Sequence, residues 1–197
     1  MAFKVPDFKD SCGDWVYRYA EDDGTRYFTR AGMLYHGLKQ RVNPSGVKQK
    51  ASPLYTGCTS EFSDFQDFSE WCQTQVGYNS DFHLDKDLLI KGNKVYSKDT
   101  CVFLPQEINK LLTKRQRFRG SLPIGLTWEK NHTSIRLGFT RGNERVHCGS
   151  YQSVEVAFAV HKKMKEDWIK QQAEKWKSQI DPRTYNALMN YQVEITD

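Results

Sequence analysis

Basic and hydroxyl side chains recur at every second position along two short stretches near residue 140, and this spacing suits nucleic-acid binding. Residues 134–140 and 145–149 each alternate apolar with polar side chains. Because successive side chains of a β-strand point to opposite faces, such strands would have one apolar and one polar face. The polar set consists of Arg136, Thr140, Arg145 and His147. Arginine matches phosphate oxygens and guanine edges, so this face is predicted to contact duplex DNA.

The residues beside this set extend the prediction, although a charged sheet face can also be merely solvated. Trp128, Lys130 and His132 are expected at the edge of the polar face. Trp128 and Lys130 are therefore added to the candidate DNA-binding residues. Alternation alone does not distinguish a DNA-binding face from a solvated one, because charged side chains ordinarily cover exposed protein surface.

The two stretches belong to a predicted domain at 121–197 with a sheet on one side and a helix on the other. Strands are expected at 124–129, 134–140 and 145–149, with turns between them. Ser153 is of a type that caps helix N-termini, and the helix predicted after it ends at Asp181-Pro182. Apolar side chains of this helix lie near one face and most lysines elsewhere. One more short helix is expected in the tail.

Several short motifs within 124–164 accompany this pattern. They are Ile-Gly-Leu-Thr-Trp at 124–128, Ile135-Arg136, Cys148-Gly149-Ser150-Tyr151, and a helix that opens with Glu155 and Ala157. Together they resemble the Apetala/ethylene-response-factor DNA-binding domain. Cys148 and Tyr151 stand where that family usually has Leu and Phe. The resemblance implies that outward strand residues grip DNA while the helix supports the sheet.

The first 112 residues are predicted to form an α+β domain that precedes a linker at 113–120. The expected elements are a hairpin around Asp23-Gly24, helices over 30–42 and 60–75, strands over 82–89 and 96–104, and a helix over 105–113. The last three elements give a ββα order. The expected fold class is therefore α+β: a hairpin and helix unit with a ββα core, then a three-stranded antiparallel sheet packed on one long helix.

The ββα segment carries its own motifs. They are Leu84-Asp85-Lys86-Asp87, Gly92-Asn93, Tyr96-Ser97, Cys101-Val102-Phe103-Leu104-Pro105 and Ile108-Asn109. These resemble the HNH homing-endonuclease family found in phages and mobile introns. The resemblance implies a metal-dependent endonuclease that nicks or cuts duplex DNA, in which Mg²⁺ or Mn²⁺ polarises the scissile phosphate and a histidine base activates water.

The resemblance assigns roles residue by residue and also shows departures. Asp85 matches the family's metal-binding Asp, and Asn109 matches its last Asn. Lys86 stands where the general-base His is expected, and Thr100 replaces a mid-motif Asn. The active site implied in this way is degenerate, so a descendant that binds DNA without cleaving it is the alternative.

Two neighbouring side chains offer substitutes for the missing groups. Strand positions two apart share a face, so His83 could replace the base and Asp87 could add a carboxylate to the metal. His83 can equally be an ordinary half-buried strand residue, and Asp87 a surface acid. The candidate catalytic residues are His83, Asp85, Lys86 and Asn109, and the candidate metal ligands are Asp85 and Asp87.

The connector between these two modules is the densest basic run of the chain. Residues 110–120 contain no acidic side chain. The cations assigned to DNA are Lys114, Arg115, Arg117 and Arg119. A solvated linker would explain them, but their position between two candidate DNA-binding modules favours contact with phosphates.

Acidic side chains in 60–70 open a third function class, a phage protein that binds and inhibits a host protein. They are Glu61, Asp64, Asp67 and Glu70. A host protein partner could dock on them, or they could form the solvated side of the predicted aromatic helix.

The composition of the chain limits which partners and which cellular location can be expected. The net charge of +5 is compatible with a polyanionic partner such as double-stranded DNA. No run of 18 apolar residues is present, so no membrane partner is expected, and the first residues do not look like a secretion signal. The 5 cysteines include no close pair, which predicts reduced thiols, a cytoplasmic location (the host cytoplasm for a phage protein) and no zinc site.

Overall fold

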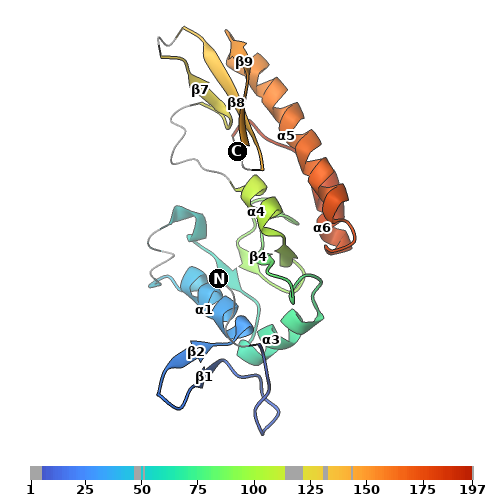
Figure 1. Cartoon of the computed structure of the whole chain (residues 1–197). Helices are drawn as coiled ribbons and strands as arrows, with labels where there is room; N and C mark the ends of the chain where they lie inside the picture. The colour runs from blue at the N-terminus through green and yellow to red at the C-terminus, as the bar shows by residue number, and fades with distance from the viewer. Residues whose placement is uncertain are drawn as a thin grey trace. The chain divides into compact units, whose positions relative to one another are not determined.

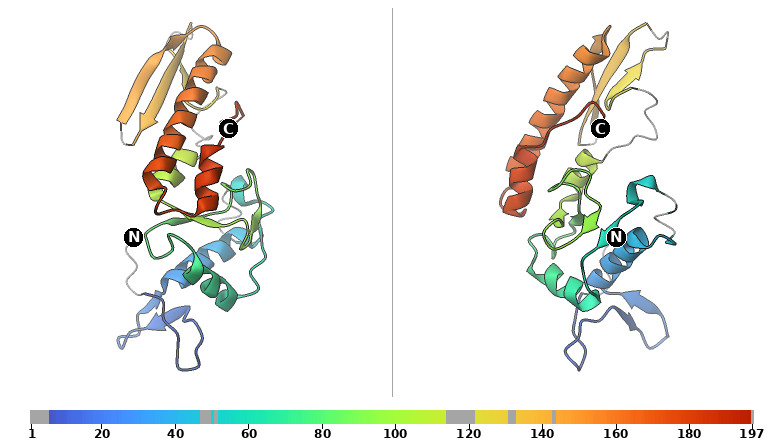
Figure 2. Two further views of the ribbon diagram at one scale, coloured as in Figure 1. Left: turned by 90° about the vertical axis from the view of Figure 1, so that its right-hand side faces the viewer. Right: turned by 180° about the vertical axis from the view of Figure 1, so that it is seen from behind.

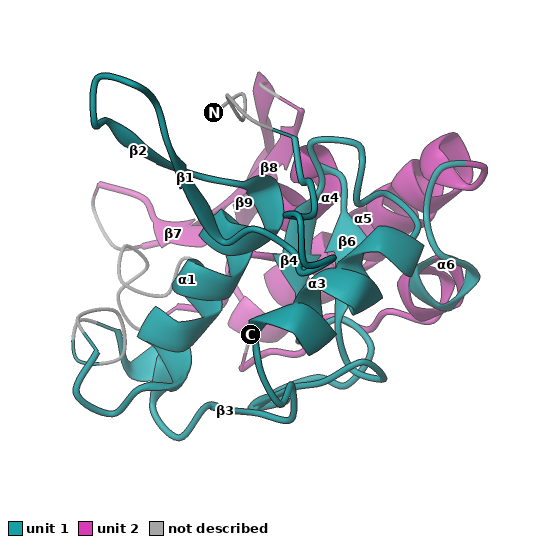
Figure 3. Cartoon of the chain, turned by 90° about the horizontal axis from the view of Figure 1, so that it is seen from below, with its two compact units in different colours: residues 1–105, 179–184 teal, residues 106–178, 185–197 magenta. Residues whose placement is uncertain are grey.

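The structure is a computed structural model that describes residues 6–46, 50, 52–113, 122–130, 133–142 and 144–196. The chain divides into two compact units (Figure 3): unit 1 is 1–105 with 179–184, and unit 2 is 106–178 with 185–197. Both units combine helices with small sheets, so the protein is of the α+β class. The predicted linker at 113–120 and the observed division after Pro105 differ by one short helix, which belongs to unit 2.

Unit 1 begins with the predicted hairpin. Strands β1 (Arg18–Ala20) and β2 (Arg26–Phe28) pair antiparallel around a turn in which Gly24 has a positive φ of 82°. Helix α1 (Arg30–Val42) follows with the predicted bounds. It starts there because the Thr29 side chain accepts a hydrogen bond from a backbone N–H of the first turn.

Helix α3 (Phe65–Thr74) carries the aromatic stripe of unit 1 and is shorter than predicted. It begins after Asp64, whose carboxylate accepts a hydrogen bond from the Asp67 backbone. A short helix, η1 (Pro53–Tyr55), and strand β3 (Thr59–Ser60) precede it. The stripe packs into a core of mutually contacting rings from Phe62, Phe68, Trp71, Tyr78 and Phe103.

The predicted ββα segment contains the expected order of elements, but one of its two predicted strands is divided into two parts that pair with different partners. Strand β4 (His83–Asp85) pairs antiparallel with β6 (Val102–Leu104), and helix α4 (Gln106–Leu112) follows. The strand predicted over 96–104 is broken in two, since its first part, β5 (Val95–Tyr96), pairs in parallel with β3. The break is a turn closed by the hydroxyls of Ser97 and Thr100.

Unit 2 has the predicted sheet and helix. Strands β7 (Leu126–Trp128), β8 (Ile135–Arg141) and β9 (Glu144–Tyr151) form an antiparallel sheet with β8 in the centre. Helix α5 (Val154–Trp176), capped by the Ser153 side chain, lies along one face of this sheet (Figures 1 and 2). It ends before the predicted Asp181, and the tail forms the expected short helix α6 (Pro182–Met189).

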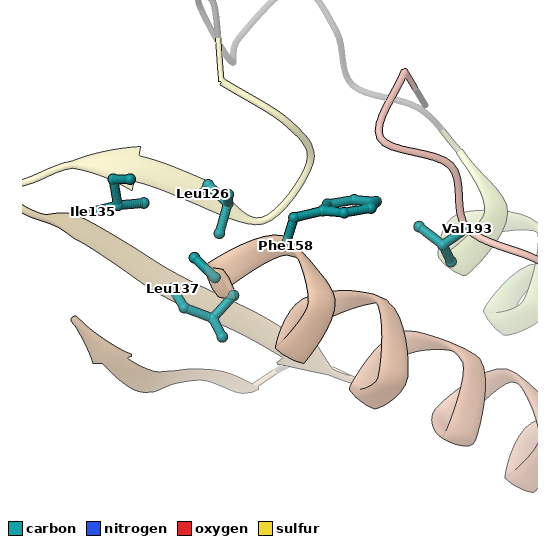
Figure 4. Packing of buried hydrophobic residues seen from close by; sticks show 6 residues of the cluster. Leu126, Ile135, Leu137, Phe158 and Val193 are labelled. Atoms are coloured by element: carbon teal, nitrogen blue, oxygen red, sulfur yellow. The ribbon is translucent and has the colours of Figure 1, made fainter. Parts of the chain in front are cut away.

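The core of unit 2 lies between the sheet and α5 (Figure 4). It is built from Leu126, Ile135, Leu137, Ala157, Phe158 and Val193. Val193 belongs to the C-terminal segment, and hydrogen bonds with α5 hold both its carbonyl group and its N–H group. Lys162 Nζ donates to its carbonyl oxygen at 2.7 Å, and its N–H donates to Glu166 Oε1 at 2.8 Å. The C-terminal segment therefore completes the core that supports the sheet.

The lysines of α5 lie mainly away from its buried face, as predicted, although Lys165 is buried together with His161. One prediction about burial in unit 2 is wrong. Val146 was placed among the apolar, helix-facing residues, yet its exposed fraction is 46% because it lies toward the end of the sheet, beyond the core cluster. Among the described residues, no helix has both the length and the apolar character to cross a membrane.

Candidate nucleic-acid interface

The strand register of unit 2 places the predicted polar residues on one face. Arg136 pairs with Thr127 on one side and with Ser150 on the other. Thr140 pairs with Arg145, and Gly138 pairs with His147. The intervening side chains of β8, from Ile135, Leu137 and Phe139, are buried against α5. Arg136, Thr140, Arg145 and His147 thus share the exposed side of the sheet, which we call the outward face.

The two arginines of the outward face have different neighbours. Arg136 Nε donates a hydrogen bond to His147 Nδ1 at 3.2 Å. The Arg145 guanidinium lies over Gly138, where a Cβ atom would come within 3.1 Å of Arg145 Nε. Among the described residues, neither arginine is paired with a carboxylate. Their positive charges are therefore directed at solvent or at a ligand.

A bulge in β9 shapes this face. Between Arg136 and Gly138 the register shifts, so that Cys148 and Gly149 both lie opposite Leu137. Gly149 has φ +112°, a conformation that other residues rarely adopt. The bulge returns Ser150 to the outward face beside Arg136, which strict alternation from His147 would not have done.

Two grooves lie on the outward face and share Thr127 and Arg136. The residues that line the first are Thr127, Arg136, Gly138, Arg145, Val146 and His147. Those that line the second are Thr127, Trp128, Glu129, Lys130, Ser134, Arg136 and Ser150. Glu129 and Ser150 were missed as candidate residues. The signal was present, because Glu129 is two positions after Thr127, but it falls just beyond the end of β7.

The remaining predicted DNA-binding residues have different outcomes. Trp128 pairs with Ile135 and so has a helix-side position in β7, yet its exposed fraction is 43% and it lines the second groove. Lys130 is exposed and lines the second groove. The predictions for Lys114, Arg115, Arg117, Arg119 and His132 lie outside the described residues.

In unit 1, the candidate metal ligand Asp85 caps a turn. Its Oδ1 accepts hydrogen bonds from the backbone N–H groups of Asp87 at 2.9 Å and Leu88 at 2.8 Å. Burial raises the pKa of the Asp85 carboxyl, and the two N–H donors oppose that rise without cancelling it. One oxygen of this carboxylate is therefore committed to holding the loop that follows β4.

Lys86 fastens the same loop. Its side chain is only 5% exposed. Its Nζ donates to Asp87 Oδ1 at 2.5 Å and to the Asn93 carbonyl oxygen at 2.6 Å, while the Asn93 amide donates to the Lys86 and Val95 carbonyl oxygens. A general base must have a free nitrogen within reach of water, whereas Lys86 Nζ is engaged as a donor by the Asp87 carboxylate and the Asn93 carbonyl. Its geometry is that of a structural clamp.

The other candidate catalytic residues, His83 and Asn109, lie on β4 and α4. His83 is exposed and shares its strand face with Asp85. Asn109 lies on α4 and belongs to unit 2. The Thr100 hydroxyl donates to the Val95 carbonyl oxygen within the turn. Nowhere in the described part of the chain do three or more His, Cys, Asp or Glu side chains gather as metal ligands would. The two candidate carboxylates, from Asp85 and Asp87, are engaged by backbone N–H groups and by the Lys86 ammonium.

Most of the acidic side chains around α3 are engaged within unit 1. Asp64 caps the helix, Asp67 pairs with Lys98, and Glu70 pairs with Lys9. These contacts favour the interpretation as a solvated helix face over a docking site for a host protein.

Comparisons of the chain with protein-family models, with curated proteins and with solved structures found no match in any of the three.

Proposed function

We propose that this protein binds duplex DNA through the outward face of β7, β8 and β9. The observation that carries the proposal is the pair of exposed guanidinium groups, from Arg136 and Arg145, which have no carboxylate partner among the described residues. Arginine forms bidentate contacts with phosphates and with guanine edges. A narrow antiparallel sheet can enter the major groove of DNA, as other strand-based DNA readers do.

The scaffold supports such binding because it fixes both arginines before a ligand arrives. The hydrogen bond to His147 orients Arg136, and the absence of a side chain at Gly138 lets the Arg145 guanidinium approach the backbone of β8 closely. A group that is already ordered loses less conformational entropy on binding. The buried core beneath β8 keeps the strand itself in place.

We further propose that the protein binds without cleaving, in keeping with the degenerate nuclease-like segment. Lys86 is neutralised by Asp87 inside a closed loop, and Asp85 Oδ1 is occupied by two backbone N–H groups. A cation bound by Asp85 and Asp87 would have to displace or repel the Lys86 ammonium. The geometry therefore favours a DNA-binding or regulatory protein over an active metal-dependent nuclease.

The DNA-binding proposal is tested by removing both arginines. We expect the Arg136→Ala/Arg145→Ala variant to bind a fluorescent duplex at least about thirtyfold more weakly at fixed salt, because each bidentate arginine contact to DNA typically contributes about 1–3 kcal/mol and two are lost. The matched control is Lys163→Ala/Lys170→Ala, which removes the same charge from exposed positions of α5. If both variants lost affinity for duplex DNA equally, the effect would come from net charge alone. That result would contradict DNA binding by the outward face.

Cleavage is tested with supercoiled plasmid in the presence of Mg²⁺ or Mn²⁺. We expect no nicked or linear product from the unaltered protein. The control is Asp85→Asn, which removes the charge but keeps an oxygen for the N–H groups of Asp87 and Leu88. Nicking that disappears in this variant, or in His83→Ala, would establish the metal-dependent nuclease instead.

A further inference from the structure

Among the residues that the structure describes, one carboxylate, from Glu129, lies on the otherwise basic outward face. Its Oε1 accepts a hydrogen bond from the Ser150 hydroxyl at 3.1 Å. Glu129 follows β7 at one edge of the sheet, Ser150 belongs to β9 at the other edge, and β8 lies between them. The contact therefore draws the carboxylate across the central strand, and the groove beside Arg136 is lined by both residues.

The position of this carboxylate is not explained by an ion pair. Within the described ranges, Glu129 is bonded to the Ser150 hydroxyl and has no cationic partner, although Arg136 and Lys130 line the same groove. Ser150 reaches the outward face only because of the bulge at Gly149. The sheet thus uses a backbone irregularity to place a donor that fixes one negative group.

A fixed carboxylate restricts what this groove can bind. It repels phosphate oxygens, so the groove beside it is unsuited to the DNA backbone. An ionised carboxylate only accepts hydrogen bonds, so it needs a donor on the DNA. In the major groove, these donors are the exocyclic amino groups of the bases. Cytosine presents its N4 amino group, whereas adenine adds the N7 acceptor next to its amino group and guanine presents two acceptors. Cytosine is the base that suits Glu129 best.

We propose that Glu129 is a specificity-determining residue that selects cytosine in the major groove, and that Ser150 is the residue that positions it. This inference rests on the proposed DNA binding by the outward face. Arg136 and Arg145 supply affinity, and Glu129 discriminates among bases at one position of the site. Removing the carboxylate therefore changes which sequences bind, more than how tightly DNA binds overall.

The test begins with selection of bound duplexes from a randomised library by the unaltered protein and by Glu129→Gln. We expect one position enriched in cytosine by the unaltered protein. Glutamine donates and accepts, which suits adenine N6 and N7, so Glu129→Gln should shift that position toward adenine. In titrations of the two selected duplexes, the ratio of their affinities should change by about tenfold or more.

The control is Glu144→Gln, which removes one negative charge from an exposed position of β9 that pairs with Arg141 rather than lining either groove. It should leave the base preference unchanged. Ser150→Ala should weaken the cytosine preference without a switch to adenine, because the carboxylate is kept but no longer held.

The outcomes separate this inference from the proposal on which it rests. If the unaltered protein binds no duplex, the DNA-binding function itself is overturned. If it binds but Glu129→Gln selects the same bases, or if Glu144→Gln changes the preference as much, the assignment of Glu129 is overturned while DNA binding stands. Far-ultraviolet circular dichroism and thermal unfolding confirm that each variant is folded.

Discussion

Cationic side chains serve opposite purposes in the two units of this protein. In unit 1, Lys86 is buried and its ammonium is shared between the Asp87 carboxylate and the Asn93 carbonyl. In unit 2, Arg136 and Arg145 are exposed and have no carboxylate partner in the described part of the chain. A positive charge alone does not identify a binding site. The charge is available to a ligand only when no other group of the folded chain already neutralises it.

The energetics explain why one charge is internal and the others remain available. A buried ammonium loses its hydration, so it must be compensated by acceptors at close range. An exposed guanidinium keeps its hydration and needs no partner for the chain to fold. The folded state therefore depends on Lys86, whereas a ligand can use Arg136 and Arg145 without disturbing the fold.

The largest effect is expected from Lys86→Ala. Truncation leaves the Asn93 carbonyl and the Asp87 carboxylate without their donor and empties a buried site. We expect the free energy of unfolding of unit 1 to fall by about 3 kcal/mol, as measured by denaturant titration. The affinity for duplex DNA should change little in conditions where the protein stays folded.

A lysine from the same loop provides the control. Lys91→Ala alters an exposed side chain and should change the free energy of unfolding by less than about 0.5 kcal/mol. If Lys86→Ala were as mild as Lys91→Ala, or abolished DNA binding in a folded protein, the clamp would be the wrong description of Lys86.

The next effect concerns the support beneath the sheet of unit 2. His161 is 4% exposed, both its ring nitrogens lack hydrogen-bond partners, and Lys165 is a neighbouring cation. Burial, together with the charge of Lys165, lowers the pKa of His161 from 6.5 to about 4. The unfolded chain therefore binds more protons than the folded one between these pH values, so acidification favours unfolding.

We expect the unfolding free energy of unit 2 to fall by about 2 kcal/mol on acidification from neutral pH to about pH 5 through this one group. The measurement is the pH profile of denaturant unfolding, compared with that of His161→Leu. Other groups titrate in both proteins, so the difference between the two profiles isolates His161. Parallel profiles would show that His161 does not resist protonation in the folded state.

The sequence predicted the sheet of unit 2 well because its information is local. Alternation of Ile135, Leu137 and Phe139 with polar residues specifies which face is buried, and a one-residue shift would expose all three. Helix α5 was predicted less accurately than the sheet. Its N-cap at Ser153 was predicted, but α5 ends at Trp176, before the predicted Asp181. Lys165 is buried although Lys163 and Lys170 are exposed, and local periodicity did not distinguish these lysines.

The missed features have a common physical origin in contacts between distant segments. The pairing of β5 with β3 divided a predicted strand, because β3 lies more than thirty residues earlier in the chain. Ser150 holds the Glu129 carboxylate on the outward face, and that contact exists only because the bulge at Gly149 shifts the register. Lys86 was assigned a catalytic position by resemblance, whereas its structural role follows from Asn93, seven residues away.

The smallest expected effect tests how finely the outward face is arranged. In Gly138→Val a side chain would meet the Arg145 guanidinium, since even a Cβ atom would lie 3.1 Å from Nε and 3.2 Å from Nη2. The guanidinium would have to move while the strand remains intact, because valine is well suited to strands. We expect the affinity for duplex DNA to fall about threefold to tenfold, with unchanged thermal stability.

A double-mutant cycle shows whether Gly138 acts through Arg145. In the Arg145→Ala background the added side chain meets no guanidinium, so Gly138→Val should have no further effect on affinity. Additive losses would instead mean that Gly138 itself approaches the DNA, since only glycine would then allow the backbone of β8 to come close. Either result places β8 at the interface, whereas no loss in the single variant would move the site away from the centre of the sheet.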